Sequence, residues 1–264
     1  KDHLGHGDNL VPVILARTPH GLFAADREFG DVTGRNGLPE IAVGRLPVVT
    51  NAELRAMIAK IKAYESGGGA WTDRALFIAD DGDGGGDFAQ SCDSLAGLAS
   101  GFQAERIYLE GSVQETRDRI AAAWNAGAGL LAYCGHGALN QLAKENIFHV
   151  SDAVGLRNGG QLPLAMMLTC VAGRFELPGF TSLGEALMLN AGGGMVGGLL
   201  PAGAALNADS LRLGEEFYKA LLRGGGATAG QALVQAMKGY LQAAGPAYVL
   251  NVYNWLGDPA LTAK

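Results

Sequence analysis

The sequence is poor in cysteine and has no apolar run long enough to cross a membrane. Its three cysteines, Cys92, Cys134 and Cys170, are too few for a disulfide scaffold, and their odd number leaves one thiol unpaired unless it bonds another chain. Residues 191–206 form the most apolar stretch, but glycines and a proline interrupt it. A membrane span needs about 18 apolar residues. We therefore expect no membrane span, and a buried strand and loop over 191–206.

Charge is also scarce. Charged residues make up 17% of the 264 residues, and the net charge of -6 argues against nucleic acid as the main partner. Hydrophobic residues make up 48%, which is enough to bury a core and excludes bulk disorder. The length suits one large α/β domain, or one domain with part of a second.

Apolar runs of strand length alternate with segments of helical spacing beyond the glycines at 67–69. This alternation favours a mainly parallel sheet covered by helices on both faces. Thr50 and Glu53 have the spacing of a capping box at the start of an earlier helix, which the glycines end. The expected strands are 41–43, 75–79, 104–109, 129–133, 164–169 and 194–200. The expected helices begin near residues 50, 88, 112, 182, 208 and 228.

Two of these strands end in residues that can carry chemistry. The strand at 129–133 leads to His136 in a Gly-His-Gly segment, and the strand at 164–169 leads to Cys170. Sites in open parallel sheets form just beyond the carboxyl ends of the strands, so His136 and Cys170 meet there if the strands are neighbours. A cysteine nucleophile needs a base, and the oxyanion it creates needs fixed donors. The backbone N–H groups of Gly137 and Cys170 are candidates for those donors.

Each feature also has a purely structural explanation. A cysteine after an apolar strand is most often a small buried residue, and a Gly-His-Gly segment is most often only a turn. Cys134 is a weaker candidate for the nucleophile because it lies closer to the strand interior. The joint occurrence of His136 and Cys170 at corresponding strand ends favours the catalytic interpretation.

An acidic, glycine-rich segment covers residues 80–87. Such loops supply oxygen ligands, so Asp81 and Asp83 are candidate calcium ligands. The segment lacks the full spacing of an EF-hand loop, and a solvated acidic loop is the alternative. It is not a phosphate-binding loop, because no Lys-Ser or Lys-Thr pair follows the glycines.

Ordered motifs along nearly the whole chain resemble the gingipain family of cysteine peptidases, which belongs to clan CD with the caspases, legumain and separase. The matching segments are 39–47 (PEIAVGRLP), 62–65 (KAYE), 75–80 (ALFIAD), 133–137 (YCGHG), 169–173 (TCVAG), 180–187 (FTSLGEAL) and 255–259 (WLGDP). The resemblance implies an α/β fold, namely a caspase-like three-layer sandwich with a mainly parallel sheet flanked by helices. It also implies that residues 1–68 are the remnant of an N-terminal subdomain and that 69–264 form the caspase-like catalytic subdomain.

The resemblance also implies roles for individual residues. Cys170 is expected to be the nucleophile and His136 the general acid/base of an endopeptidase that forms a thioester with protein or peptide substrates. Gly137 and Cys170 would supply the oxyanion hole, and Asp80 or Asp81 would orient the histidine. No cofactor is expected to be required for catalysis, and structural calcium is an additional expectation.

Asp87 is the expected selector of a basic residue, Arg or Lys, before the cleaved bond, because it falls nearest the acid of the family's S1 pocket. A cap of the following helix is the alternative role. The aromatic wall of that pocket is expected near 205–208, where this sequence reads Ala-Leu-Asn-Ala. Two alternatives stay open: a preference for Asn or Asp, and a catalytically silent domain used for binding.

The family also implies partners and a location outside the cell. Strands upstream of residue 1, or a pro-domain of the same precursor, are expected partners of this chain, as in enzymes made as zymogens. The expected location is secreted, or on the cell surface of a bacterium.

Overall fold

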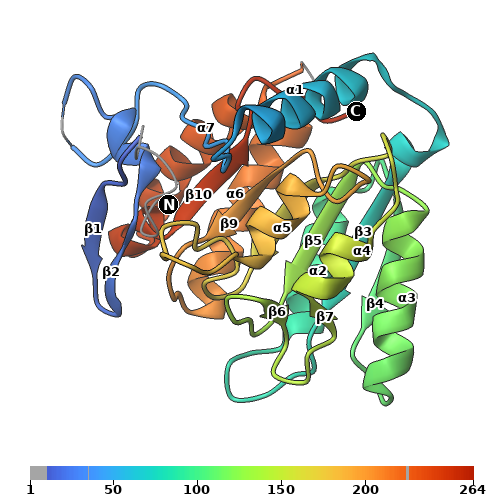
Figure 1. Ribbon diagram of the computed structural model, residues 1–264. Helices are drawn as coiled ribbons and strands as arrows, with labels where there is room; N and C mark the ends of the chain where they lie inside the picture. Colours follow the sequence, from blue (N-terminus) through green and yellow to red (C-terminus); the bar gives the residue numbers. More distant parts are fainter. Residues whose placement is uncertain (1–10, 35, 224–225) are drawn as a thin grey trace.

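A six-stranded sheet forms the centre of the molecule in the computed structural model, which describes residues 11–34, 36–223 and 226–264 (Figure 1). The strand order is β10-β9-β8-β5-β3-β4, and only β10 runs antiparallel to its neighbour. The strands are β3 (Arg74–Ala79), β4 (Gln103–Tyr108), β5 (Leu130–Cys134), β8 (Leu164–Leu168), β9 (Gly197–Pro201) and β10 (Tyr253–Gly257). Every residue of β5, β8, β9 and β10 is buried, as expected for strands covered on both faces.

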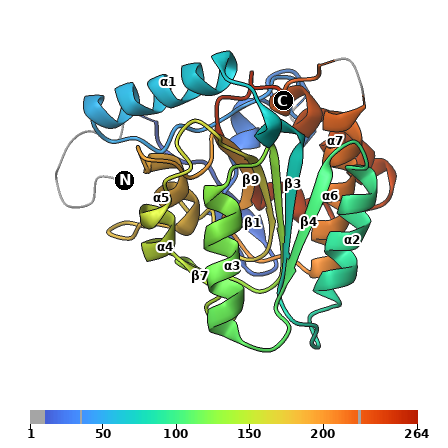
Figure 2. The ribbon, with the colours of Figure 1, turned by 90° about the vertical axis from the view of Figure 1, so that its right-hand side faces the viewer.

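Helices cover both faces of this sheet and complete a three-layer α/β sandwich (Figure 2). One layer holds α2 (Phe88–Leu98), α6 (Asn207–Leu222) and α7 (Ala229–Gln242). The other holds α3 (Val113–Asn125), α4 (Val150–Gly155) and α5 (Leu183–Leu189), with α1 (Asn51–Ser66) packed against α5. The expected fold class is therefore confirmed.

Local sequence signals explain several of these helix starts. The Thr50 hydroxyl oxygen accepts a hydrogen bond from the Glu53 amide, and the Glu53 carboxylate accepts one from the Thr50 amide, which makes the capping box expected there. Ser182 and Glu185 make the same box at the start of α5. These bonds satisfy amides that would otherwise lack partners at the first turn.

The strands before α1 do not lie where the sequence predicts one. This part of the chain contains the hairpin of β1 (Leu15–Thr18) and β2 (Gly21–Ala24), followed by a short 3-10 helix. The strand expected at 41–43 does not form, and only Arg45 makes a single bridge to Leu256 of β10. Prolines at 39 and 47 flank this segment and lack the N–H donors that a longer ladder needs.

Two basic side chains, Arg45 and Lys60, join this N-terminal part to the rest of the molecule. Arg45 forms a bidentate ion pair with Asp26 at 2.6 and 2.7 Å, and its guanidinium lies 4.6 Å from the centre of the Phe175 ring. Lys60 of α1 donates to the carbonyl oxygens of Leu187, Met188 and Asn190, at the C-terminal end of α5. The expected subdomain boundary after residue 68 falls between α1 and β3 and stays a prediction.

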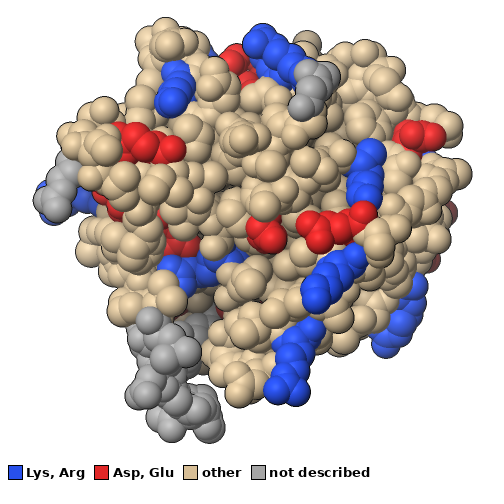
Figure 3. All heavy atoms as spheres, turned by 90° about the horizontal axis from the view of Figure 1, so that it is seen from above, with Lys and Arg blue, Asp and Glu red and all other residues tan. Residues whose placement is uncertain are grey.

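The surface agrees with the low charge of the sequence. On the face seen from above, basic and acidic side chains are interspersed among uncharged ones (Figure 3). Within the described ranges, no helix is both long and apolar enough to cross a membrane.

The Arg45–Asp26 pair generates a prediction about stability, because its side chains are only 13% and 3% exposed. We expect Arg45→Met to lower the free energy of unfolding by about 3 kcal/mol, since it leaves the Asp26 carboxylate buried without its partner. Arg106→Met breaks the pair of Arg106 with Asp93, in which the two side chains are 46% and 52% exposed. This change should lower the free energy of unfolding by less than about 1 kcal/mol. Urea denaturation measures both, and equal losses would contradict the assignment.

Candidate active site

The pairing of β5 with β8 brings the predicted dyad to one edge of the sheet. Cys134 at the end of β5 lies opposite Leu168 at the end of β8, and the Gly135 amide donates to the Leu168 carbonyl oxygen at 3.2 Å. His136 and Cys170 each follow two residues beyond the strand end. Parallel strands end at the same edge, so both residues lie on adjacent loops there.

Gly137 is the point at which these two loops meet. A Cβ atom added to Gly137 would lie 2.3 Å from Thr169 Oγ1 and 3.2 Å from the Cys170 carbonyl oxygen, so a larger residue would push the loops apart. The structure thus places Gly137, one of the predicted oxyanion donors, directly against the loop that carries Cys170.

Cys170 differs from the other two cysteines in its accessibility. Cys92 and Cys134 are buried, whereas Cys170 is partly exposed. Val171, the next residue, has a φ of 48°, a left-handed conformation that is strained for a β-branched residue. Its amide donates to the Gly203 carbonyl oxygen at 3.1 Å, which helps to hold this turn.

The backbone of His136 is held from both sides by buried polar groups. Its amide donates to Asp80 Oδ2 at 3.0 Å, and its carbonyl oxygen accepts from the Tyr133 hydroxyl at 2.6 Å and the Ala143 amide at 2.8 Å. Burial raises the pKa of the Asp80 carboxyl to about 6. These contacts give Asp80 a role at the backbone of His136 rather than at its ring.

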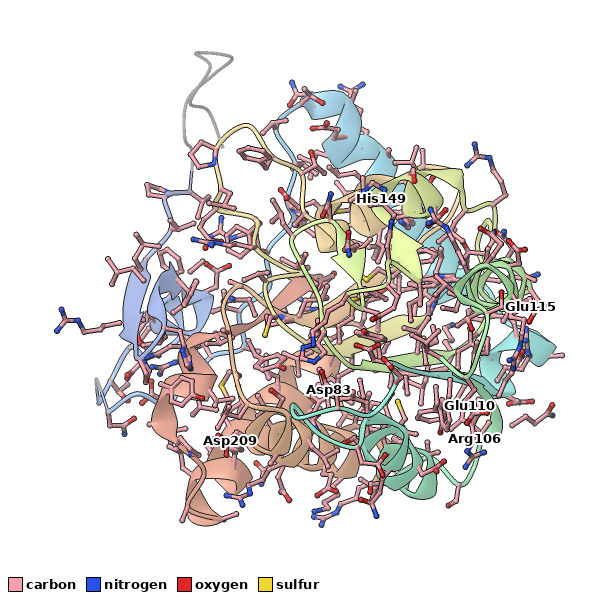
Figure 4. The ribbon with its side chains drawn as sticks, turned by 90° about the horizontal axis from the view of Figure 1, so that it is seen from below. Asp83, Arg106, Glu110, Glu115, His149 and Asp209 are labelled. Atoms are coloured by element: carbon pink, nitrogen blue, oxygen red, sulfur yellow. The ribbon has the colours of Figure 1, made fainter. Side chains whose placement is uncertain are left out.

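The carboxylate on the His136 ring belongs to Asp83. Its two oxygens lie 3.0 and 3.1 Å from His136 Nε2, and Oδ2 also accepts from Lys144 Nζ at 2.7 Å. Figure 4 views this edge of the sheet and labels Asp83. The family resemblance implies Asp80 or Asp81 at this place, and neither contacts the ring. Asp83 occupies it because hydrogen bonds between Asp83 and Gly86 close a tight turn that folds back over the ring.

The same turn leaves space for the imidazole. A Cβ atom on Gly85 would lie 3.0 Å from His136 Cε1, so only glycine allows this close approach without displacing the ring. Phe88 meets the ring edge-on, with 5.2 Å between centroids. The ring therefore has contacts with Asp83 and Phe88 and lies close to the Gly85 backbone.

Asp87 caps a helix in this structure. It is exposed, and its Oδ1 accepts from the Gln90 amide at 2.9 Å at the first turn of α2. The start of α6 lies beside it, since Asn207 Nδ2 donates to Ser91 Oγ at 3.1 Å. The second carboxylate oxygen of Asp87 can still accept a bond from a ligand, so its S1 role stays a prediction.

An aromatic ring does lie beside the 205–208 segment, although the segment itself contains none. Burial raises the pKa of the Tyr248 hydroxyl, and the nearby backbone of Leu206 opposes part of that rise. The Tyr248 ring also meets His20 edge-on at 5.8 Å. Sequence reasoning missed Tyr248 because it lies some 40 residues further along the chain, in the 3-10 helix η3 (Ala247–Asn251).

The acidic residues of the 80–87 segment separate into two groups. Carboxylate oxygens of Asp80, Asp81 and Glu145 lie within 4.8 Å of one another, whereas Asp83 contacts His136 and Lys144. The two predicted calcium ligands, Asp81 and Asp83, thus have different surroundings. Asp81 belongs to a group of three carboxylates, which supplies only part of the oxygen shell that Ca²⁺ needs, and calcium binding stays a prediction.

A six-stranded α/β sandwich with a thiol and an imidazole at its carboxyl edge defines a caspase-like class of protein. The chain belongs to peptidase family C25, whose family model matches residues 1–264. It is 27% identical over 200 residues to gingipain R2 and to gingipain R1 of Porphyromonas gingivalis. The match covers 69% of this chain but only 26% and 20% of those proteins, so the chain spans a minor part of their length.

Solved structures show the same fold. The crystal structure of the Arg specific cysteine proteinase gingipain R has a TM-score of 0.82 at 22% identity, covering 95% of this chain and 61% of that one. A complex of the pro- and mature domains of RgpB from Porphyromonas gingivalis has a TM-score of 0.80 at 23% identity, covering 94% and 62%. Saccharomyces cerevisiae separase, in its complex with securin, is more distant, with a TM-score of 0.55 at 12% identity. That match covers 86% of this chain and 14% of the separase complex chain.

The accessibility of Cys170 generates a second prediction. Brief iodoacetamide treatment of the native protein should add one carbamidomethyl group, at Cys170, because the other two thiols are buried. The urea-unfolded protein should take up three. Mass spectrometry of the intact protein and its peptides measures this, and Cys170→Ala is the control that should stay unmodified. Rapid labelling of Cys92 or Cys134 in the native protein would contradict the assignment.

Proposed function

We propose that this chain is the catalytic part of a cysteine endopeptidase with Cys170 as nucleophile and His136 as general acid/base. The observation that carries the proposal is the meeting of the Cys170 and His136 loops at the carboxyl ends of β8 and β5, with Gly137 at the contact. Family membership supports the reaction class.

The geometry suits a thioester mechanism. The Cys170 sulfur attacks the scissile carbonyl carbon, and the N–H groups of Gly137 and Cys170 stabilise the oxyanion that forms. His136 receives the thiol proton and delivers it to the leaving amine. Water then attacks the thioester, with His136 as base, and releases the acid and the free thiol.

Asp83 gives the His136 ring a defined orientation for these steps. Lys144, the Gly85 amide and His136 hold the pKa of the Asp83 carboxyl well below its usual range, so it is ionised at neutral pH. An ionised carboxylate on Nε2 favours a proton on that nitrogen. Nδ1 is then the nitrogen that exchanges protons with Cys170 and the substrate.

A basic residue before the cleaved bond is the preference we propose. Asp87 lies at the start of α2, beside the start of α6, and keeps one carboxylate oxygen for a guanidinium or ammonium group. The related gingipain R is described as Arg specific. Tyr248 and Leu206 would form part of the S1-pocket wall. In the family an aromatic residue is expected in that wall.

The wider setting follows from the relatives. We propose that the protein acts outside a bacterial cell, secreted or at the surface, on protein or peptide substrates. A pro-domain accompanies the related RgpB, and this chain is proposed to have such a partner in its precursor and to be made as a zymogen.

Peptides that differ only in the residue before the scissile bond test the function. We expect the intact protein to cleave after Arg or Lys at least about 100-fold faster than after Asn, Asp or Ala, measured as kcat/KM. Cys170→Ala should lower cleavage at least about 1,000-fold, because no other group can form the thioester. Cleavage after Asn or Asp alone would overturn the basic preference. Equal cleavage by the variant would overturn the nucleophile, and no cleavage by either protein would favour a binding domain.

Asp87→Asn separates the two roles of Asp87. Asparagine caps helices as well as aspartate does, so the melting temperature should be unchanged. The charge that selects a basic residue is lost, so kcat/KM for an Arg peptide should fall about 100-fold. Steady-state kinetics and thermal unfolding measure the two effects. Unchanged Arg cleavage would restrict Asp87 to helix capping.

A further inference from the structure

Lys144 shares one carboxylate oxygen with the candidate catalytic histidine. Its Nζ lies 2.7 Å from Asp83 Oδ2, and His136 Nε2 lies 3.0 Å from the same atom. The Lys144 side chain is 62% exposed, so it does not serve as a core residue. Asp83 raises the pKa of the Lys144 amine, which is therefore charged at neutral pH.

The position of Lys144 is tied to the backbone of His136. Ala143, the residue before it, donates its amide to the His136 carbonyl oxygen at 2.8 Å and to the Tyr133 hydroxyl at 2.9 Å. Ala143 has a φ of 60°, a left-handed turn that redirects the chain after β6 (Gln141–Leu142). The backbone next to Lys144 is thus bonded to His136, and Asp83 contacts the ring of that same histidine.

The acidic surroundings explain why a cation is needed there. Asp80, Asp81 and Glu145 cluster within 4.8 Å of one another beside the turn that carries Asp83. Asp83 itself is one-third exposed, in a turn of glycines with little side-chain packing. Like charges repel and water competes for the carboxylate, so the turn needs an opposing charge to keep Asp83 on the ring.

We propose that Lys144 is a positioning residue that holds the Asp83 carboxylate against His136 Nε2. The Lys144–Asp83–His136 chain joins the loop of Asp83 to the loop of Lys144 and fixes the imidazole through its Nε2 atom. The effect of Lys144 on turnover rests on the proposed function, whereas its effect on the ring does not.

Three single variants test this role in the intact protein. Lys144→Met should lower kcat about fivefold and leave KM nearly unchanged, because Lys144 acts on the histidine and not on the substrate. Lys144→Arg should restore kcat, since it keeps the charge and the reach. Lys219→Met removes a comparable lysine, paired with Glu216 at 2.8 Å on α6, and should change neither constant. An unchanged kcat in Lys144→Met, or a rise in KM alone, would overturn the proposal.

A double-mutant cycle tests whether Lys144 acts through Asp83. Asp83→Asn should lower kcat more than Lys144→Met does, because the ring loses its ionised partner. In the Asp83→Asn background, Lys144→Met should have no further effect on kcat. Independent, multiplying effects would show that Lys144 acts by another route and would overturn the proposal.

A spectroscopic measurement separates this inference from the peptidase proposal. In the Cys170→Ala protein, the ring ¹⁵N chemical shifts of His136 should report a proton on Nε2, with the signal assigned by its loss in His136→Asn. Adding Lys144→Met should shift these resonances towards a mixture of tautomers, and Lys144→Arg should restore them. If the native protein cleaves nothing but the shifts change as expected, only the proposed function fails. Unchanged shifts in Lys144→Met overturn the positioning role.

Discussion

The parallel, in-register pairing of β5 with β8 is the constraint on which the candidate site depends. Because Cys134 lies opposite Leu168, the residues two positions beyond each strand emerge side by side. A shift of one residue would turn every side chain of β8 to the other face and separate His136 from Cys170. The complete burial of both strands opposes such a shift, so the core that stabilises the sheet also sets the distance between the two loops.

Different kinds of interaction hold the two parts of His136. Buried groups, Asp80 and Tyr133, hold the backbone, where an unpaired polar atom would be costly. Half-exposed groups, Asp83 and Lys144, hold the ring, where solvent screens each contact. The histidine therefore has a firmly placed main chain and a side chain whose orientation can respond to the charges around it.

Much of this arrangement is predictable from the sequence. The βα alternation, the capping boxes and the strand ends at His136 and Cys170 all follow from local patterns. The carboxylate partner of the His136 ring does not, because Asp83 and His136 are 53 residues apart and a turn of glycines can point a carboxylate in many directions. β10 is not predictable in the same way, because its five residues carry no local strand signal. It pairs antiparallel with β9, and Trp255 packs against Gly197 of that strand.

The two basic side chains that link the N-terminal part to the rest of the molecule bear on where this chain can be divided. Arg45 fastens the 3-10 helix of Asp26 to the edge of β10, and Lys60 closes the carbonyl end of α5. A segment that began at β3 would leave those carbonyls without their Lys60 Nζ donor and the edge of β10 without its neighbour. The part of the chain before Gly67-Gly68-Gly69 and the sheet therefore satisfy each other's polar groups, although three glycines separate them in the sequence.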